Sequence, residues 1–122
     1  MTSLAAPRPK DFSVLISIVN YRTAALAVEC LRSLQPEVAA QGRTQIVVLD
    51  NASGDDSVAH IQAAIDREGW GAWARVVASP RNGGFAAGNN DAVRAARAAG
   101  MSFDFVWLVN PDARVRPGAL AR

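Results

Sequence analysis

The sequence has one cysteine and no long uninterrupted apolar segment. A single thiol cannot form an internal disulfide, which favours a reducing compartment. No stretch approaches the roughly 20 apolar residues of a membrane span, and residues 1–12 lack the apolar core of a signal peptide. We therefore expect a flexible leader over 1–12, one domain over 13–122 with no integral membrane segment, and a place in the cytoplasm or at the inner membrane surface.

Clustered positive charge is also missing. The chain has 13 basic and 11 acidic residues, a net charge of +2, and all but one of the basic residues are arginines spread along its length. Nucleic-acid-binding domains gather such residues on one face or in a run. The sequence therefore predicts no nucleic-acid partner and is compatible with an anionic small molecule.

Four segments rich in β-branched and aromatic residues alternate with helical patterns. The strand-like segments are 14–19, 45–49, 74–78 and 103–109, and three of them are mostly apolar without alternation, as strands covered on both faces are. Between them, helical faces are formed by Leu26, Cys30, Leu31 and Leu34, by Val58, Ile61 and Ile65, and by the alanine-rich segment 85–99. The order β-α-β-α-β-α-β predicts an α/β fold with a doubly wound, Rossmann-like and mainly parallel sheet.

Local signals place the helix ends. Ser53 or Asp55 is positioned to cap the second helix, and Gly42, Gly69 and Gly100 stand where the three helices should stop. Cys30 lies among leucines at helical spacing, so we expect a buried thiol without a catalytic role.

Polar or turn-forming residues follow every strand. The strands run into Asn20, Asp50, Asn82 and Asp112. Each of these segments could be an ordinary turn or helix cap. Open α/β sheets bind ligands in the crevice outside the carboxyl ends of their strands, so the four together favour a shared binding cleft.

Two common nucleotide-binding motifs are absent. Gly83 and Gly88 have P-loop spacing, but asparagines follow where lysine and serine or threonine are required. No glycine-rich turn follows the first strand, which argues against NAD binding and also against a nucleotidyltransferase. The loop at 82–84 still offers close backbone approach and free N–H groups at a helix start, which suit an anion.

Four motifs in order resemble the inverting glycosyltransferases of family 2, which have the GT-A fold. The matching segments are 18–21, 46–53, 82–90 and 108–113, and the resemblance covers nearly everything from Ser13 onward. The Asn-Pro-Asp form of the last motif is similar to the rhamnosyltransferase-like branch. The resemblance implies that this chain is the N-terminal, donor-binding half of an enzyme of polysaccharide biosynthesis that moves a sugar from a nucleotide diphosphate to an acceptor hydroxyl.

The resemblance also implies residue roles. Residues implied to line the donor nucleotide are Val19, Asn20, Tyr21, Asp50, Asn82, Gly84, Asn89, Asn110 and Asp112. Asp112 matches the last aspartate of the family's D-x-D motif, which binds Mg²⁺ or Mn²⁺ together with the diphosphate. Asn110 replaces the first acid, which leaves the choice of metal open. The implied partners are a dTDP-, UDP- or GDP-linked sugar and a glycan or lipid-linked glycan acceptor.

The sequence lacks a candidate for the catalytic base that inverting transfer requires. The family's base lies downstream of the last motif, and Asp55, Asp56 and Asp91 are better explained as caps and helix surface. An alternative is therefore a catalytically incomplete fragment that acts as a nucleotide-sugar-binding or assembly module. An uncovered sheet edge would also favour homo-oligomers.

Overall fold

The computed structural model describes residues 12–112, which form four strands and three helices in alternation. In chain order the elements are β1 (Val14–Asn20), α1 (Ala24–Ala40), β2 (Thr44–Asp50), α2 (Ser57–Glu68), β3 (Ala74–Ala78), α3 (Phe85–Ala98) and β4 (Phe105–Val109). The predicted alternation is confirmed. The leader predicted over 1–12 lies outside the described residues except for Phe12.

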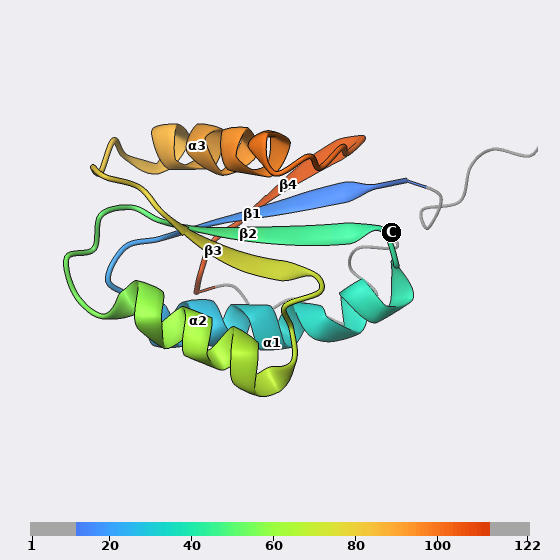
Figure 1. Ribbon diagram of the computed structural model, residues 1–122, viewed down its shortest axis with the longest axis horizontal. Coiled ribbons are helices and arrows are strands. Elements are labelled where there is room, and N and C mark those ends of the chain that lie inside the picture. Colours follow the sequence, from blue (N-terminus) through green and yellow to red (C-terminus); the bar gives the residue numbers. More distant parts are fainter. Residues whose placement is uncertain (1–11, 113–122) are drawn as a thin grey trace, which may run out of the picture.

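The sheet has the strand order β3-β2-β1-β4, and every neighbouring pair is parallel. Helices α1 and α2 cover one face and α3 covers the other, so the molecule has three layers (Figure 1). The chain runs outward from β1 to β3 and then returns to place β4 on the other side of β1. The order of the strands therefore reverses between β1 and β4, which makes this a doubly wound sheet, as predicted.

Alternating side chains of β1 and β2 fill two cores. Ile16, Ile18, Ile46 and Val48 belong to the core under α1 and α2, whereas Leu15, Val47 and Leu49 pack with Ala92 and Ala96 of α3. Successive strand residues point to opposite faces of a sheet. Both faces of β1 and β2 are buried, which explains why the two strands read as continuous apolar runs.

The helix boundaries correct several details. Leu26 was expected on the buried face of α1, but it is 43% exposed, whereas Cys30, Leu31 and Leu34 are fully buried. The predicted caps of α2 are also wrong: the N-cap residue is Asp56, which makes no side-chain cap bond. Asp55 instead accepts a hydrogen bond from the Ser57 N–H at 2.9 Å, and the side chain of Ser53 turns back to β2.

Two of the three predicted glycine stops have the expected conformation. Gly69 is the left-handed C-cap of α2, with φ of 74°, and Gly100 follows α3 with φ of 84°. The C-cap of α1 is Gln41, and Gly42 lies beyond it without a positive φ. Left-handed backbone favours glycine because it has no Cβ.

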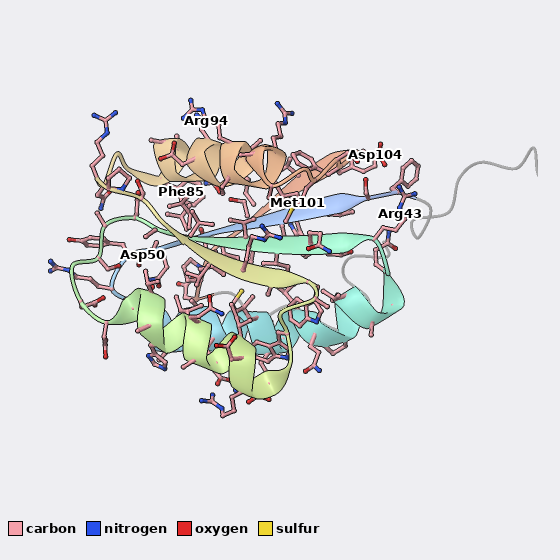
Figure 2. All side chains as sticks on the ribbon, in the orientation of Figure 1. Arg43, Asp50, Phe85, Arg94, Met101 and Asp104 are labelled. Carbon is pink, nitrogen blue, oxygen red and sulfur yellow. The ribbon has the colours of Figure 1, made fainter. Side chains whose placement is uncertain are left out.

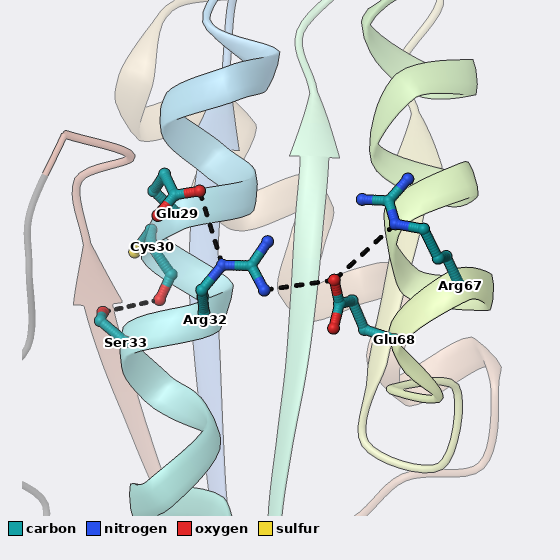
Figure 3. A network of polar contacts seen from close by, with 6 residues as sticks. All are labelled: Glu29, Cys30, Arg32, Ser33, Arg67 and Glu68. Carbon is teal, nitrogen blue, oxygen red and sulfur yellow. Dashed lines mark hydrogen bonds and ion pairs between the residues drawn. The ribbon is translucent and has the colours of Figure 1, made fainter.

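A polar network joins the outer surfaces of α1 and α2 (Figure 3). Arg32 lies between Glu29, at 3.5 Å, and Glu68, at 3.2 Å, and Glu68 also meets Arg67 at 3.7 Å. The Arg32 guanidinium stacks over the Trp70 ring, with 5.4 Å to the centroid. These are largely exposed ion pairs, which contribute little to stability because solvent screens them. The Arg32–Glu68 pair links the two helices, and the apolar core beneath them supplies most of the stability.

Strand β4 forms one edge of the described sheet and is partly uncovered. Phe105, Val106 and Leu108 are 54%, 41% and 50% exposed, and the Phe12 ring packs edge-on against Phe105. Within residues 12–112, no helix is both long and apolar enough to cross a membrane.

Cys30 is a buried thiol, as predicted. Burial, assisted by the negative charge of Asp112, raises the pKa of Cys30 to about 11. The unfolded thiol ionises nearer its ordinary value of 9.0. The folded state therefore gains stability from the neutral thiol below pH 9, and that contribution is lost as the pH rises toward 11.

We accordingly expect Cys30 to resist alkylation by iodoacetamide at pH 8 until the chain unfolds. The difference in unfolding free energy between the wild type and Cys30→Ala should shrink between pH 9 and 11. Urea denaturation at several pH values measures this difference. Rapid alkylation of the folded chain at pH 8 would contradict the description of this thiol.

Candidate functional site

The loops that follow the four strands all lie at one edge of the sheet. In Figure 2, Asp50 and Phe85 lie at the end of the molecule where the strands finish, and Arg43 and Asp104 lie at the opposite end. The strand order reverses at this edge between β1 and β4. Ligands of doubly wound folds bind outside the carboxyl ends at such a point.

Asn20 and Asp50 meet beneath this edge, on the α1 and α2 side of the sheet. The Asn20 amide donates to Asp50 Oδ1 at 2.9 Å. Ser53 completes the arrangement, since its hydroxyl donates to Asp50 Oδ1 at 2.6 Å and its N–H donates to Oδ2 at 3.1 Å. Asn20 is fully buried and Asp50 is 4% exposed. In this structure the pair therefore joins two loops from below, and direct contact with a ligand stays a prediction.

Arg22 ties the loop after β1 to the loop after β2. Its N–H donates to Ser53 Oγ and its Nε donates to the Ser53 carbonyl, both at 2.9 Å. Its backbone is left-handed, with φ of 57°, a conformation that costs a non-glycine residue about 1–3 kcal/mol and often marks a functional site. The guanidinium lies over the Tyr21 ring, 5.0 Å from its centre, which is a cation–π contact. Tyr21 is 43% exposed.

An open hollow of about 360 Å³ lies at the reversal point between β1 and β4. Four of the nine predicted site residues line it, together with three that sequence reasoning did not select: the first set is Val19, Tyr21, Asn110 and Asp112, and the second is Thr23, Leu26 and Pro111. The exposure of Leu26 is thereby explained, because its side chain faces this hollow and not the core.

The loop before α3, residues 81–84, is held by side-chain hydrogen bonds; we call it the glycine loop. Asn82 Oδ1 accepts the Gly84 N–H at 2.8 Å. The Asn51 amide, from the end of β2, donates to Asn82 Oδ1 at 2.9 Å and to the Gly84 carbonyl at 3.1 Å. Gly84 has φ of 92° and ψ of −179°, a region that is essentially restricted to glycine.

Helix α3 approaches β1 closely at Gly88. A Cβ added there would lie 2.9 and 3.0 Å from the two methyl carbons of Val19 and 3.4 Å from the Asn51 amide nitrogen. Only a residue without a side chain fits this contact. The start of α3 is thereby brought against the strand end that lines the hollow.

Asn89 faces the sheet. Ser17, in the middle of β1, donates to Asn89 Oδ1 at 2.6 Å, and Asn89 Nδ2 donates to the Phe85 carbonyl at 3.1 Å. Ser17 is fully buried and Asn89 is 6% exposed. Asn89 therefore anchors the first turns of α3 to β1, and its predicted place along the donor stays a prediction.

The Ser17–Asn89 contact leads to a stability prediction. Ser17→Ala leaves the buried Asn89 oxygen without its donor, which should lower the free energy of unfolding by about 1–3 kcal/mol. The exposed Ser102 provides the matched control, and Ser102→Ala should change it by less than about 0.5 kcal/mol. Equal urea midpoints for the two variants would show that the contact contributes nothing to stability.

The nine predicted residues thus form three groups around one edge. Val19, Tyr21, Asn110 and Asp112 line the hollow, Asn20 and Asp50 lie buried below it, and Asn82, Gly84 and Asn89 belong to the glycine loop and the start of α3. Sequence reasoning missed Asn51 and Ser53 as residues that hold the site together. The spacing of Asp50 and Ser53 was the available signal, because an aspartate followed three residues later by a serine is typical of a hydrogen-bonded turn.

The oxygen atoms at the hollow fit a hard divalent cation. Asp112 supplies an exposed carboxylate and Asn110 an amide oxygen, both from the loop after β4. Over residues 12–112 there is no group of three or more histidine, cysteine, aspartate or glutamate side chains that could hold a metal by itself. Mg²⁺ is often bound by one or two carboxylates together with substrate phosphates, so these residues suffice only when a phosphorylated ligand contributes.

The sequence matches glycosyl transferase family 2 over residues 13–122. The match covers most of the chain, and the chain therefore belongs to this family. A search of curated proteins returned no match.

Solved glycosyltransferase structures share the fold. A mannosyltransferase from Pyrobaculum calidifontis, solved with GDP-Man and Mn²⁺, superposes with a TM-score of 0.77 at 21% identity, over 99% of this chain and 34% of that one. S. aureus TarS 1–349 gives 0.67 at 20% identity, over 88% of this chain and 30% of that one. Its complex with UDP-GlcNAc gives the same TM-score. These likenesses establish the GT-A type of fold, and the chain spans about a third of the length of each relative.

Proposed function

We propose that this chain binds a nucleotide-diphosphate sugar at the hollow between β1 and β4, as the donor half of an inverting, metal-assisted sugar transferase. The observation that carries the proposal is the hollow itself. It places an exposed aromatic ring, Tyr21, and an exposed carboxylate, Asp112, on facing loops at the point where the strand order reverses. A nucleobase stacks on such a ring, and a diphosphate with its metal requires such a carboxylate.

Different residues would bind the metal, the base and the anionic part of the donor. Asp112 and Asn110 would hold Mg²⁺ or Mn²⁺ against the diphosphate, and the metal would stabilise the negative charge that grows on the leaving nucleotide. Tyr21, stiffened by Arg22, would orient the base. The free N–H groups at the start of α3 lie beyond the glycine loop and would favour the anionic part of the donor.

The binding-only alternative retains a specific observation in its favour. The Asp50 carboxylate is bound by Asn20 and Ser53, Asp91 pairs with Arg94 at 2.8 Å, and Asp55 accepts from the N–H of Ser57. None of these three carboxylates lines the hollow between β1 and β4. Asp112 is the one carboxylate among the described residues that line the hollow. The proposal assigns it to the metal, so deprotonation of an acceptor hydroxyl would require a group from outside that lining.

A dTDP-, UDP- or GDP-linked sugar would be the donor, and a glycan or lipid-linked glycan the acceptor, at the inner membrane surface during polysaccharide synthesis. A rhamnosyl donor is supported by the Asn-Pro-Asp sequence at 110–112. The exposed apolar side chains of β4 would favour pairing with a second polypeptide, a copy of this chain included.

Calorimetry tests the proposal. The full chain should bind one of UDP-GlcNAc, GDP-mannose or dTDP-rhamnose in the presence of Mn²⁺, and the affinity should fall when EDTA is added. Transfer or hydrolysis of the bound donor would then separate the enzyme from the binding module, and the anomeric configuration of the product would report inversion. Absence of binding for all three donors at millimolar concentration, with Mn²⁺ and with Mg²⁺, would argue against the proposal.

A further inference from the structure

Asn51 connects the end of β2 to the glycine loop through its side chain. It is 3% exposed and lies at the end of β2, where its N–H donates to the Asn20 carbonyl at 2.8 Å. Its side chain emerges on the α3 face of the sheet, because Asp50 before it points to the α1 and α2 face. The backbone of Asn51 is therefore bonded to the end of β1, while its side-chain amide lies on the side of the sheet that α3 covers.

Both donor bonds of the Asn51 amide go to the glycine loop. Nδ2 donates to Asn82 Oδ1 at 2.9 Å and to the Gly84 carbonyl at 3.1 Å. The opposite orientation of the amide would place its oxygen against the Gly84 carbonyl, which can only accept. Asn82 cannot reverse either without losing the Gly84 N–H bond at 2.8 Å. The hydrogen-bond pattern therefore requires a donor at this atom of residue 51.

The other end of the Asn51 amide has no partner among residues 12–112. Oδ1 is a buried acceptor that receives no hydrogen bond from this part of the chain, and such an atom costs about 1–3 kcal/mol. An apolar side chain would avoid that cost. That asparagine stands here despite this cost is consistent with a structural need for its two bonds to the glycine loop.

We propose that Asn51 is a positioning residue that sets the conformation of the glycine loop and thereby the affinity for the donor. The proposal rests on the proposed function for its second part only. Without the two bonds, Gly84 loses the support of its left-handed conformation, and the start of α3 loses its register against Val19 at the rim of the hollow. Asn51 itself need not touch the donor.

Asn51→Asp tests the proposal because it preserves shape and removes the donor atom. Near pH 8 the introduced carboxylate would face two acceptors, and the glycine loop should open, with donor affinity at least about tenfold weaker, equivalent to about 1.4 kcal/mol. Burial among acceptors raises the pKa of such a carboxyl. Near pH 5 the protonated group has one O–H and can restore one of the two bonds, so affinity should recover in part relative to the wild type at the same pH.

Amide hydrogen exchange at Gly84 gives a readout that does not depend on the donor. Exchange should accelerate at least about tenfold in Asn51→Asp near pH 8, after correction for intrinsic rates, and slow again near pH 5. Asn90→Asp, an identical change at an exposed position of α3, should alter neither property. If Asn51→Asp does not fold, Asn51→Ala removes both donated bonds without burying a charge and should accelerate Gly84 exchange in the same way.

The outcomes separate the two proposals. A wild-type chain that binds no donor overturns the proposed function, and Gly84 exchange then decides the structural part of the inference alone. Unchanged Gly84 exchange in both variants overturns the positioning role. Donor affinity that falls equally at both pH values, or that does not fall while Gly84 exchange accelerates, overturns the link between the loop and donor binding.

Discussion

Asp112→Asn should weaken donor binding by at least about tenfold in the presence of Mn²⁺, because the carboxylate that would bridge the cation to the diphosphate is lost. In EDTA the same variant should bind the nucleotide as well as the wild type or better. The carboxylate then faces an anionic ligand with no cation between them, and its removal relieves repulsion. The sign of the effect should therefore reverse with the metal.

A matched control removes the same charge elsewhere. Asp66 lies on α2, where it accepts a hydrogen bond from Gln62, and Asp66→Asn should leave donor affinity unchanged in both buffers. Calorimetric titrations of the three proteins, each with Mn²⁺ and with EDTA, measure the effect. A loss of affinity in Asp112→Asn that is equal with and without metal would mean that Asp112 binds the donor in some other way.

Gly88→Val should lower the free energy of unfolding by at least about 2 kcal/mol. The added Cβ alone would lie 2.9 Å from a Val19 methyl carbon, and overpacking of this kind costs about 1–3 kcal/mol before the further methyl groups are placed. Val19 cannot rotate away easily, because a β-branched side chain on a buried strand has few allowed rotamers. Helix α3 would have to shift away from β1.

Two further variants isolate the cause. Within the described part of the chain, no atom lies within 4 Å of a Cβ added at Gly71, so Gly71→Val should change stability by less than about 0.5 kcal/mol. Val19→Ala should return part of the loss when combined with Gly88→Val, because it removes the methyl groups that clash. Urea denaturation measures the free energy of unfolding of the wild type, Gly88→Val, Gly71→Val and the double variant. A double variant no more stable than Gly88→Val would show that the damage does not come from the Val19 contact.

The fold could be predicted largely because β1 and β2 are covered on both faces. The same expectation was wrong for the segment 103–109, because β4 lies at the edge with Phe105, Val106 and Leu108 exposed. Burial by helices on each side makes β1 and β2 continuous apolar runs, and this pattern differs from both a half-exposed strand and a helix. The error at Leu26 has a local origin. Helical spacing identifies the side of a helix but not whether that side meets the core or a hollow, and Leu26 lies where α1 passes the site.

The edge that carries the site could also be predicted, whereas the contacts of its residues could not. Polar side chains after parallel strands must share one edge, which is a consequence of topology. Whether such a side chain faces solvent or the interior depends on the neighbouring loops. Strand alternation points Asn20 and Asp50 to the α1 and α2 face, and Ser53, itself held by Arg22, satisfies the Asp50 carboxylate there. Asn51 could not be distinguished from its neighbour Asp50 in a turn-like sequence.

The central claim is that the hollow between β1 and β4 holds a metal-bound nucleotide sugar. Paramagnetic broadening tests it most directly: the ¹⁵N-labelled chain is saturated with Mg²⁺ and a bound donor, and trace Mn²⁺ is then added. The account predicts that signals of Tyr21, Asn110 and Asp112 broaden first, and that they do so only when the donor is present. Broadening that centres on another part of the chain, or that is the same without the donor, would contradict it.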